Sequence, residues 1–314
     1  MRDYIIRRLL GLIPILIGIS IAIFIIMQLI PGDVVSGILG IEQTPELRAM
    51  WEKKLGLDRP LVEQYLTWIG KALTGDFGES FRTGAPVFPE ILRRFWISAE
   101  LAVLACIIAW IIAFPLGILS ALRRNSIVDR IVRVVALLGV SVPNFASATL
   151  LILFLSKGFH YYTPIKYVGL FENFSVNMEI MLLPAMILGS VMAGSVMRMT
   201  RSSMLEVMRQ DYIKAVRAKG APERVTIFRH AFRNSSIPIV TLIGMQMGGL
   251  LGGTVVIEQI FSIPGLGQFT LTGITQRDYP VVQGCVLFIA FLYVMINLLV
   301  DILYTYIDPR ITYN

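Results

Sequence analysis

Side chains that could carry out covalent or metal chemistry are scarce in this chain of 314 residues. It contains two histidines, His160 and His230, and two cysteines, Cys106 and Cys285. An enzyme needs a nucleophile and a base at one depth, and a metal centre needs several clustered ligands. The histidines lie in different hydrophilic segments, and each cysteine lies in an apolar run, where packing is the ordinary role of a thiol. The sequence therefore predicts no catalytic residue and no metal site.

A different chemistry, that of a docking surface, is indicated by the basic segment Asp211–Pro238. Nine Lys and Arg residues occur from Arg198 to Arg233, a range that includes most of this segment. Gly220 predicts a helix end, because glycine takes the left-handed conformation without steric cost and the preceding cations suit the negative end of a helix. Pro222 fits the first turn of a second helix, where its missing amide costs nothing.

Two short helices should flank this glycine. Ser203 and Glu206 have capping-box spacing and predict that the first helix begins at Ser203, with an apolar face made by Leu205, Met208, Tyr212, Ala215 and Val216. The second has a stripe of Val225, Phe228 and Phe232 and ends at Asn234 to Pro238. The segment is thus predicted to form a helix, a glycine elbow and a second helix. It is suited either to docking in a partner or to anchoring neighbouring spans as an amphipathic hairpin.

The elements that position this elbow lie in a membrane. Hydrophobic residues make up 55% of the chain, charged residues 16%, and the mean hydropathy is +0.71, whereas soluble proteins carry about 25% charged residues. Unbroken apolar runs favour helices over barrel strands. The predicted fold class is an all-α polytopic membrane protein with six transmembrane helices, of about 20 residues each: Leu9 to Ile30, Ser98 to Leu122, Ile131 to Ser156, Met181 to Met197, Ile237 to Ile260, and Val281 to Ile302.

The charged residues between these stretches predict how the chain is oriented in the membrane and where its regions begin and end. Lys and Arg are retained in short cytoplasmic loops, and they gather before the first stretch, between the second and third, and in the elbow, so both termini are expected in the cytoplasm. This anchoring accounts for the net charge of +7 without nucleic acid as a partner. The expected regions are 1–30 (tail and first span), 31–97 (external domain), 98–302 (five-helix core, with the elbow loop at 198–236) and 303–314 (cytoplasmic tail).

Polar residues inside the apolar stretches are candidates for a substrate path, since burying them in lipid without partners is costly. They are Ser141, Asn144, Ser147, Ser190, Gln246 and Asn297. Hydrogen bonding between helices is the alternative role. Pro264 and Gly265 predict a turn, which is either a gating loop at the outer mouth or a simple connector. No filter-like sequence supports an ion channel, and no pair of catalytic residues supports an intramembrane enzyme.

Several motifs resemble one family of transporters. The elbow residues Lys214-Ala215-Val216-x-x-x-Gly220 and His230-Ala231-Phe232-Arg233-Asn234 are similar to the EAA loop of ABC importer permeases, in the form found in the dipeptide, oligopeptide and nickel permeases. Further similarities extend over nearly the whole chain, in the order that the family shows: Arg7-Arg8-Leu9-Leu10, Pro31-Gly32-Asp33, Leu55-Gly56-Leu57-Asp58-Arg59-Pro60, Gly75-Asp76-Phe77-Gly78-Glu79-Ser80, Ser141-Val142-Pro143-Asn144-Phe145, Phe261-x-x-Pro264-Gly265-Leu266-Gly267, Arg277-Asp278-Tyr279-Pro280-Val281-Val282-Gln283 and Asp308-Pro309-Arg310. Lys214 stands where the general pattern has Glu, and Val34 where proline often follows Pro-Gly-Asp.

The resemblance implies a type I ABC importer transmembrane domain in a bacterial or archaeal plasma membrane. Its implied partners are a homologous second permease, two ATP-binding subunits, an external binding protein and membrane lipid. The chain has no phosphate-binding loop of the Gly-x-x-x-x-Gly-Lys-Ser/Thr type, so ATP and Mg belong to the partner subunits and no cofactor is expected here. The implied cargo is a di- or oligopeptide, with nickel chelates, glutathione and metallophores as alternatives. The implied ATPase-coupling residues are Asp211, Tyr212, Lys214, Ala215, Arg217, Ala218, Lys219, Gly220, Ala221, Pro222 and His230.

Overall fold

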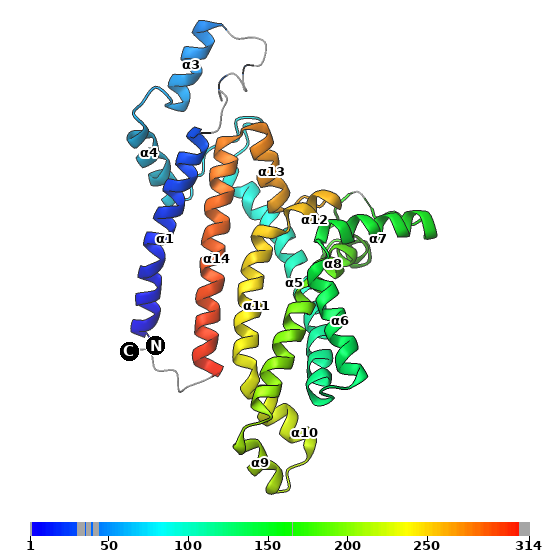
Figure 1. Cartoon of the computed structure of the whole chain (residues 1–314). Coiled ribbons are helices and arrows are strands. Elements are labelled where there is room, and N and C mark those ends of the chain that lie inside the picture. Colours follow the sequence, from blue (N-terminus) through cyan, green and yellow to red (C-terminus); the bar gives the residue numbers. More distant parts are fainter. Residues whose placement is uncertain (1, 30–34, 36–38, 40–43, 165, 308–314) are drawn as a thin grey trace. The chain divides into compact units, whose positions relative to one another are not determined.

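The computed structural model describes residues 2–29, 35, 39, 44–164 and 166–307, and it divides the chain into two compact units. The first unit comprises residues 1–98 and 264–295, and the second comprises residues 99–263 and 296–314. In the described ranges every regular element is a helix (Figure 1). The predicted all-α fold class is therefore confirmed. The motifs Pro31-Gly32-Asp33 and Asp308-Pro309-Arg310 and the tail from residue 308 lie outside the described residues.

In the described residues, the first unit contains four whole helices and the first parts of two others. Their bounds are α1 Arg2–Leu29, α3 Pro45–Leu55, α4 Leu61–Leu73, α13 Leu266–Gln276, and the starts of α5 (Val87–Leu122) and α14 (Tyr279–Ile307). One apolar cluster joins the start of α5 to α13 and α14 through Val87, Ile91, Leu266 and Cys285. A second joins Ile23 and Met27 of α1 to Val282 of α14. Local signals start and stop α3: Thr44 accepts from the Leu47 amide, and Gly56 ends the helix with φ 69°.

The second unit holds the rest of α5 and the helices that carry the elbow. These are α6 Ile127–Ser141, α7 Asn144–Phe159, α8 Phe174–Val207, α9 Asp211–Ala218, α10 Glu223–Val225, the π-helix Thr226–Phe232, α11 Arg233–Gly253 and α12 Val255–Ile260. The long helix α8 packs against α6 and α11. Glycines allow its closest contacts: a Cβ on Gly189 would lie 2.7 Å from the carbonyl oxygen of Ala105, and one on Gly194 2.5 Å from that of Ala136. Small residues at such crossings let membrane helices approach closely.

Four helices in the described residues are long and apolar enough to cross a membrane, over Leu10–Leu29, Val87–Leu122, Phe174–Val207 and Tyr279–Ile302. They correspond to the first, second, fourth and sixth predicted stretches. The fifth stretch falls on α11 and α12, which separate at Thr254 and are not among the four. The predicted count of six spans is therefore not confirmed.

The third predicted stretch, Ile131 to Ser156, is not one straight span. It comprises parts of α6 and α7, which meet at an angle of 99° and pass the length and hydropathy test only as a pair. Val142 and Pro143 are both extended at the break. The physical reason is Pro143, which cannot donate to the preceding helical turn and which disfavours the helical conformation of Val142. Pro115 and Pro184, in contrast, lie inside the continuous helices α5 and α8.

Candidate functional site

The candidate functional site is the elbow loop between α8 and α11, and its first helix is α9. Gln210 is extended and precedes α9, and Asp211 occupies its first turn, where a carboxylate is favourable. The prediction that this helix begins at Ser203 is wrong. Ser203 lies inside α8, which continues to Val207, and it is buried. Its neighbouring amides are already paired within α8, so the capping-box spacing has no free amide to cap.

The turn at Gly220 is confirmed. Its φ is 77°, in the left-handed region, and its amide donates to the carbonyl of Arg217 at 2.9 Å. The Lys219 amide donates to Ala215 at 3.1 Å, which closes the last turn of α9. A Cβ on Gly220 would meet no atom within 4 Å. Glycine is therefore required here by the backbone conformation and not by lack of space.

Pro222 and an ion pair set the return of the chain. Pro222 immediately precedes α10, and its carbonyl accepts from the Thr226 amide at 3.0 Å. Arg217 of α9 donates to both carboxylate oxygens of Glu223, at 2.6 and 3.2 Å. These hydrogen bonds raise the pKa of Arg217 and lower the pKa of Glu223. The pair links the two sides of the elbow at its exposed tip.

The second side of the elbow runs into α11 without a stop. The π-helix Thr226–Phe232 leads directly into α11 at Arg233, so the predicted end at Asn234 to Pro238 is wrong. Asn234 has a tying role instead: its amide donates to the Tyr212 hydroxyl at 2.8 Å and to the His230 carbonyl at 2.9 Å. Tyr212 thereby fixes α9 to the start of α11, and His230 takes part through its backbone.

Apolar side chains anchor the elbow to α5 and α8. The buried cluster contains Ile118, Ala121, Met204, Val207, Ile213, Ile227 and Ala231. The predicted stripes are only partly correct, since Leu205, Met208, Tyr212 and Phe232 pack against this cluster, whereas Ala215, Val225 and Phe228 are exposed. The breaks in the helices explain the error, because a π-helix and the turn before α9 both shift which residues share a face.

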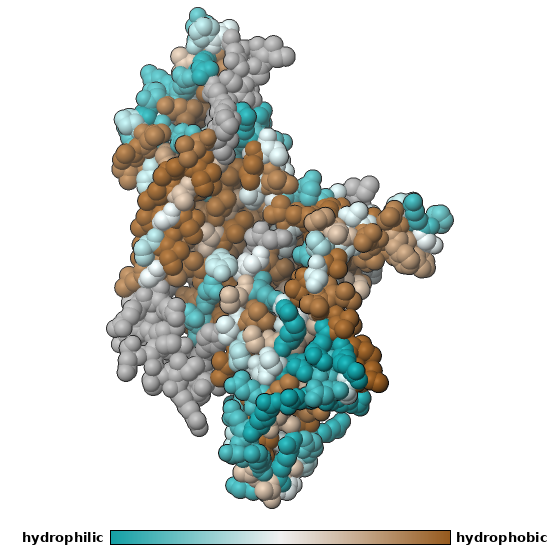
Figure 2. All heavy atoms as spheres, viewed as in Figure 1, coloured by the Kyte–Doolittle hydropathy of each residue, from teal (hydrophilic) through white to brown (hydrophobic). Residues whose placement is uncertain are grey.

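The outer surface of the elbow is hydrophilic. Asp211, Lys214, Arg217, Ala218, Lys219, Gly220 and Pro222 are exposed, whereas Tyr212 and Ala221 are half-buried. Lys214 pairs with Asp211 at 2.8 Å. Figure 2 shows this region at the bottom of the view as mostly hydrophilic atoms. The elbow thus presents a charged tip on an apolar anchor.

A buried ion pair that the sequence reading missed holds α8 just before the elbow. Asp129 of α6 is fully buried, and Arg201 of α8 donates to its two oxygens at 2.7 and 2.9 Å. The Ser120 hydroxyl and the Asn125 amide also donate to Asp129, at 2.6 and 3.0 Å. The signal in the sequence is a lone aspartate among arginines at the start of an apolar run.

The six proposed path residues lie on α6, α7, α8, α11 and α14, and their role in a substrate path stays a prediction. Ser141 ends α6 and Asn144 begins α7, on the two sides of the 99° break. Ser147 is half-buried on α7, and the hydroxyl of Ser190 donates to the Ile187 carbonyl in its own helix at 2.8 Å. Gln246 has a buried side-chain oxygen for which the described residues offer no donor. Asn297 lies half-buried on α14.

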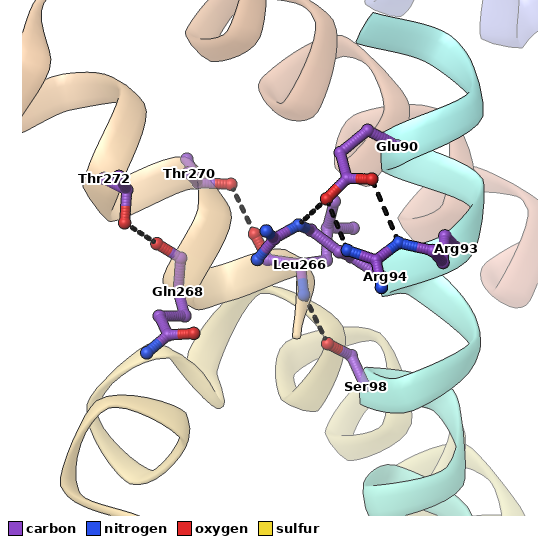
Figure 3. Close-up of polar contacts among 8 residues, drawn as sticks. All are labelled: Glu90, Arg93, Arg94, Ser98, Leu266, Gln268, Thr270 and Thr272. Carbon is purple, nitrogen blue, oxygen red and sulfur yellow. Dashed lines mark hydrogen bonds and ion pairs between the residues drawn. The ribbon is translucent and has the colours of Figure 1, made fainter. Parts of the chain in front are cut away.

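The segment after Pro264 and Gly265 is a helix. Gly265 precedes α13, and the amide of Leu266 donates to the hydroxyl of Ser98 on α5 at 2.8 Å. Arg94 of α5 lies over the ring of Phe269, 4.4 Å from its centroid, and pairs with Glu90 at 2.6 Å. Figure 3 shows the pairs of Glu90 with Arg93 and Arg94 on α5 and the bond between Leu266 and Ser98, with Thr270 and Thr272 bonded within α13.

Comparison with known proteins identifies the family. The model described as "binding-protein-dependent transport system inner membrane component" matches residues 113–313, and the model of the N-terminal part of these components matches residues 1–102. The chain belongs to this family. The permease is 41% identical to a dipeptide transport system permease protein of Alkalihalophilus pseudofirmus and 39% identical to one of Escherichia coli K12, over the full length of both chains in each case. A peptide transport system permease protein of Brucella abortus, named as putative, is 41% identical over the same extent.

Solved structures support the fold. A chain of the MetNI methionine ABC transporter in an inward-facing conformation matches with a TM-score of 0.57 and 18% identity, over 70% of this chain and 96% of that chain. A second crystal form of the same transporter gives a TM-score of 0.52. At this identity the match concerns the fold alone. The resemblance to ABC importer permeases is thus confirmed, and the chain is a multi-pass inner-membrane transport component with a type I importer fold.

Proposed function

We propose that the permease forms, with a homologous second permease, the translocation path of an ATP-driven importer for di- or oligopeptides. The names of its full-length relatives in two bacteria support this cargo. Nickel chelates, glutathione and metallophores are the alternatives. An external binding protein delivers the cargo, and two separate subunits bind ATP and Mg. Both termini and the elbow lie on the cytoplasmic side, as the positions of Lys and Arg indicate.

The single observation that carries this proposal is the construction of the elbow. Its tip is exposed and charged, while Ile213, Ile227 and Ala231 are buried against α5 and α8. A force on the tip is therefore transmitted to two long helices through close-packed side chains. Coupling requires that the ATPase cleft contact the elbow differently in its two arrangements. The coupling surface is made by the exposed residues, above all Arg217, Lys219 and Gly220.

The test is to disturb the tip without disturbing the anchor. Gly220→Trp adds bulk at a position where a Cβ would meet no atom within 4 Å, so a loss of coupling points to a partner or to the strained backbone. In proteoliposomes with all partner subunits, we expect ATP hydrolysis to persist while peptide uptake per ATP falls at least about tenfold, which corresponds to about 1.4 kcal/mol. Unchanged coupling would contradict the proposal.

A matched glycine separates strain from docking. Gly75 also has a positive φ, 85°, and open space around its Cβ position. Gly75→Trp therefore carries a similar backbone cost of about 1–2 kcal/mol, yet it lies outside the elbow. We expect this variant to keep normal uptake per ATP. Equal uncoupling in the two variants would show that strain, and not docking, is responsible.

Cargo is tested separately from coupling. The binding protein that co-purifies with the permease would be titrated with dipeptides, longer peptides, nickel chelates and glutathione in a calorimeter. We expect peptides to bind and the other ligands to fail. If only a nickel chelate binds, the proposed peptide cargo is wrong, and the proposed coupling role of the elbow is unaffected.

A further inference from the structure

Helix α4 (Leu61–Leu73) has three chemically distinct sides. Counting about 100° per residue, Tyr65 and Trp68 share one side, Val62, Leu66 and Leu73 fall within about 40° of one another on the next, and Thr67 and Lys71 lie opposite. The apolar side chains cover a wider arc of the helix than a single neighbouring helix can bury. A helix with this distribution has an apolar face left over after it packs against a single neighbour.

The aromatic side of α4 packs against the last turns of α1. The rings of Tyr65 and Trp68 lie 5.5 and 6.3 Å from the ring of Phe24, centroid to centroid. The Tyr65 hydroxyl is 2.8 Å from the hydroxyl of Ser20. One turn nearer the end of α1, the Gln28 amide donates to the side-chain oxygen of Gln64 at 3.3 Å. These contacts place α4 beside α1 from Ser20 to Gln28.

This stretch of α1 lies at membrane depth. The apolar span on α1 extends over Leu10–Leu29, and its 20 residues cover about 30 Å, the thickness of the hydrocarbon core. Ser20 lies about 13 Å along the helix axis from Leu29 at 1.5 Å per residue. A helix in contact with Ser20 and Phe24 therefore reaches below the head-group region.

The remaining apolar face of α4 is open. Val62, Leu66 and Leu73 are 70%, 60% and 82% exposed. On α1 the neighbouring exposed residues are Ile21, Ile25 and Leu29, which follow Ser20, Phe24 and Gln28 by one position and so lie beside the stripe that contacts α4. Figure 2 shows the apolar surface of α1 continuing onto α4 at the upper left of the view. The face is thus an extension of a membrane span.

The polar side of α4 borders a cavity within the first unit. Gln64, Thr67 and Lys71 line a cavity of about 300 Å³ together with Arg59, Asp76 and Gln283. Polar groups are tolerated at membrane depth where they line a cavity that water can enter. The two sides of α4 are therefore suited to two different media.

We propose that α4 is an interfacial membrane helix whose Val62, Leu66 and Leu73 face is covered by lipid acyl chains. Part of the segment expected to be an external domain is then embedded in the bilayer beside α1. Burial of this face contributes to holding the segment at a fixed depth, since apolar area determines how strongly an interfacial helix binds. The proposal does not depend on the cargo or on the coupling role of the elbow.

The test places a fluorescent probe on each side of α4. In a background with Cys106→Ala and Cys285→Ala, single cysteines at Leu66, Leu73 and Thr67 carry the same bimane label. Leu66 and Thr67 are adjacent and differ only in the side of the helix they occupy. The assembled transporter is studied in nanodiscs of phosphatidylcholine, with and without bromine on the acyl chains. We expect quenching at Leu66 and Leu73 at least about twice that at Thr67, and iodide quenching in the reverse order.

Three results would overturn the proposal. Equal quenching by bromolipid on both sides would mean that α4 has no preferred face. Strong iodide quenching at Leu66 would place that face in water. Protection of Leu66 from both quenchers would mean that a protein, such as the second permease or the binding protein, covers it. If the cysteine at Leu66 prevents assembly, the adjacent pair Val62→Cys and Glu63→Cys gives the same comparison.

Discussion

The elbow and α4 are both amphipathic, yet they expose opposite faces. The elbow buries Ile213 and Ile227 against α5 and α8 and exposes charges such as Lys219. Helix α4 packs Tyr65 and Trp68 against α1 and exposes Val62 and Leu66. Amphipathicity alone therefore does not say what covers an element. The chemistry of the face that remains open does, because charged faces suit water or a polar partner and apolar faces suit lipid.

The largest expected effect comes from breaking the buried pair that holds α8 above the elbow. Arg201→Ala removes the nearer cation of the buried Asp129 carboxylate and leaves it only the exposed Arg133, at 3.6 Å, so the cost falls toward the lower end of the about 3–5 kcal/mol typical of a broken buried pair. We expect a large fall in Tm and in yield of the assembled complex, measured by thermal unfolding in detergent. The double variant Asp129→Asn with Arg201→Gln should recover part of the loss. Equal losses in the single and double variants would contradict this assignment.

The next effect concerns the anchor of the elbow. Ile213 is fully buried, so Ile213→Ala leaves a cavity beside Met204 and costs roughly 2–4 kcal/mol, against about 1 kcal/mol for Ile213→Val. We expect uptake per ATP to fall in Ile213→Ala and to remain nearly normal in Ile213→Val. Normal coupling in both variants would show that the elbow does not need a close-packed anchor.

A charge on each open face sharpens the contrast between lipid and water. Leu66→Glu places a carboxylate on the face of α4 that lipid is proposed to cover, at a cost of about 1 kcal/mol near the membrane interface. Ala215→Glu places one on the exposed face of α9, where a cost below about 0.5 kcal/mol is typical of surface sites. Thermal unfolding in lipid nanodiscs should show a lower Tm for Leu66→Glu and an unchanged Tm for Ala215→Glu. Equal Tm values would count against the lipid contact.

The smallest effect is electrostatic and local to the tip. The pKa of Glu223 is lowered by Arg217, so the pair stabilises the elbow fully above the unfolded pKa, near 4.5, and this stabilisation is lost as the pH falls through the lowered value. Both side chains are exposed, which limits the contribution to below about 1 kcal/mol. Hydrogen exchange of α9 amides should accelerate slightly in Glu223→Gln at neutral pH and match the unmodified chain in acid.

The sequence predicted the turn at Gly220 correctly, but it did not predict which residues of the elbow helices share the buried face. Gly220 after Arg217 and Lys219 identified the turn because few backbone conformations suit that combination. The buried residues of the elbow were missed, because the turn before α9 and the π-helix before α11 change which side chains share a face. Such breaks depend on tertiary packing and leave little trace in the periodicity.

Contacts between residues that are distant in the sequence could not be predicted either. Asp129 of α6 and Arg201 of α8 are far apart in the sequence, and no regular spacing predicts that they form a pair. The 99° break at Pro143 was visible as a proline but not as an angle. The amphipathic pattern of α4 was present in residues 61–73, but only its contact with Ser20 and Phe24 shows how deep it lies.

Cross-linking of the elbow tip tests the central claim most directly. In the chain with both native cysteines replaced, Lys219→Cys places a thiol on the exposed tip, and Lys157→Cys places one on the exposed end of α7 as a control. With a maleimide that carries a photoreactive benzophenone, which inserts into C–H bonds of a neighbouring chain, and the assembled transporter, we predict that the Lys219 position links to the ATP-binding subunit with a yield that changes on adding ATP, and that the Lys157 position does not. Absence of this link, or equal linking from both positions, would contradict the coupling role of the elbow.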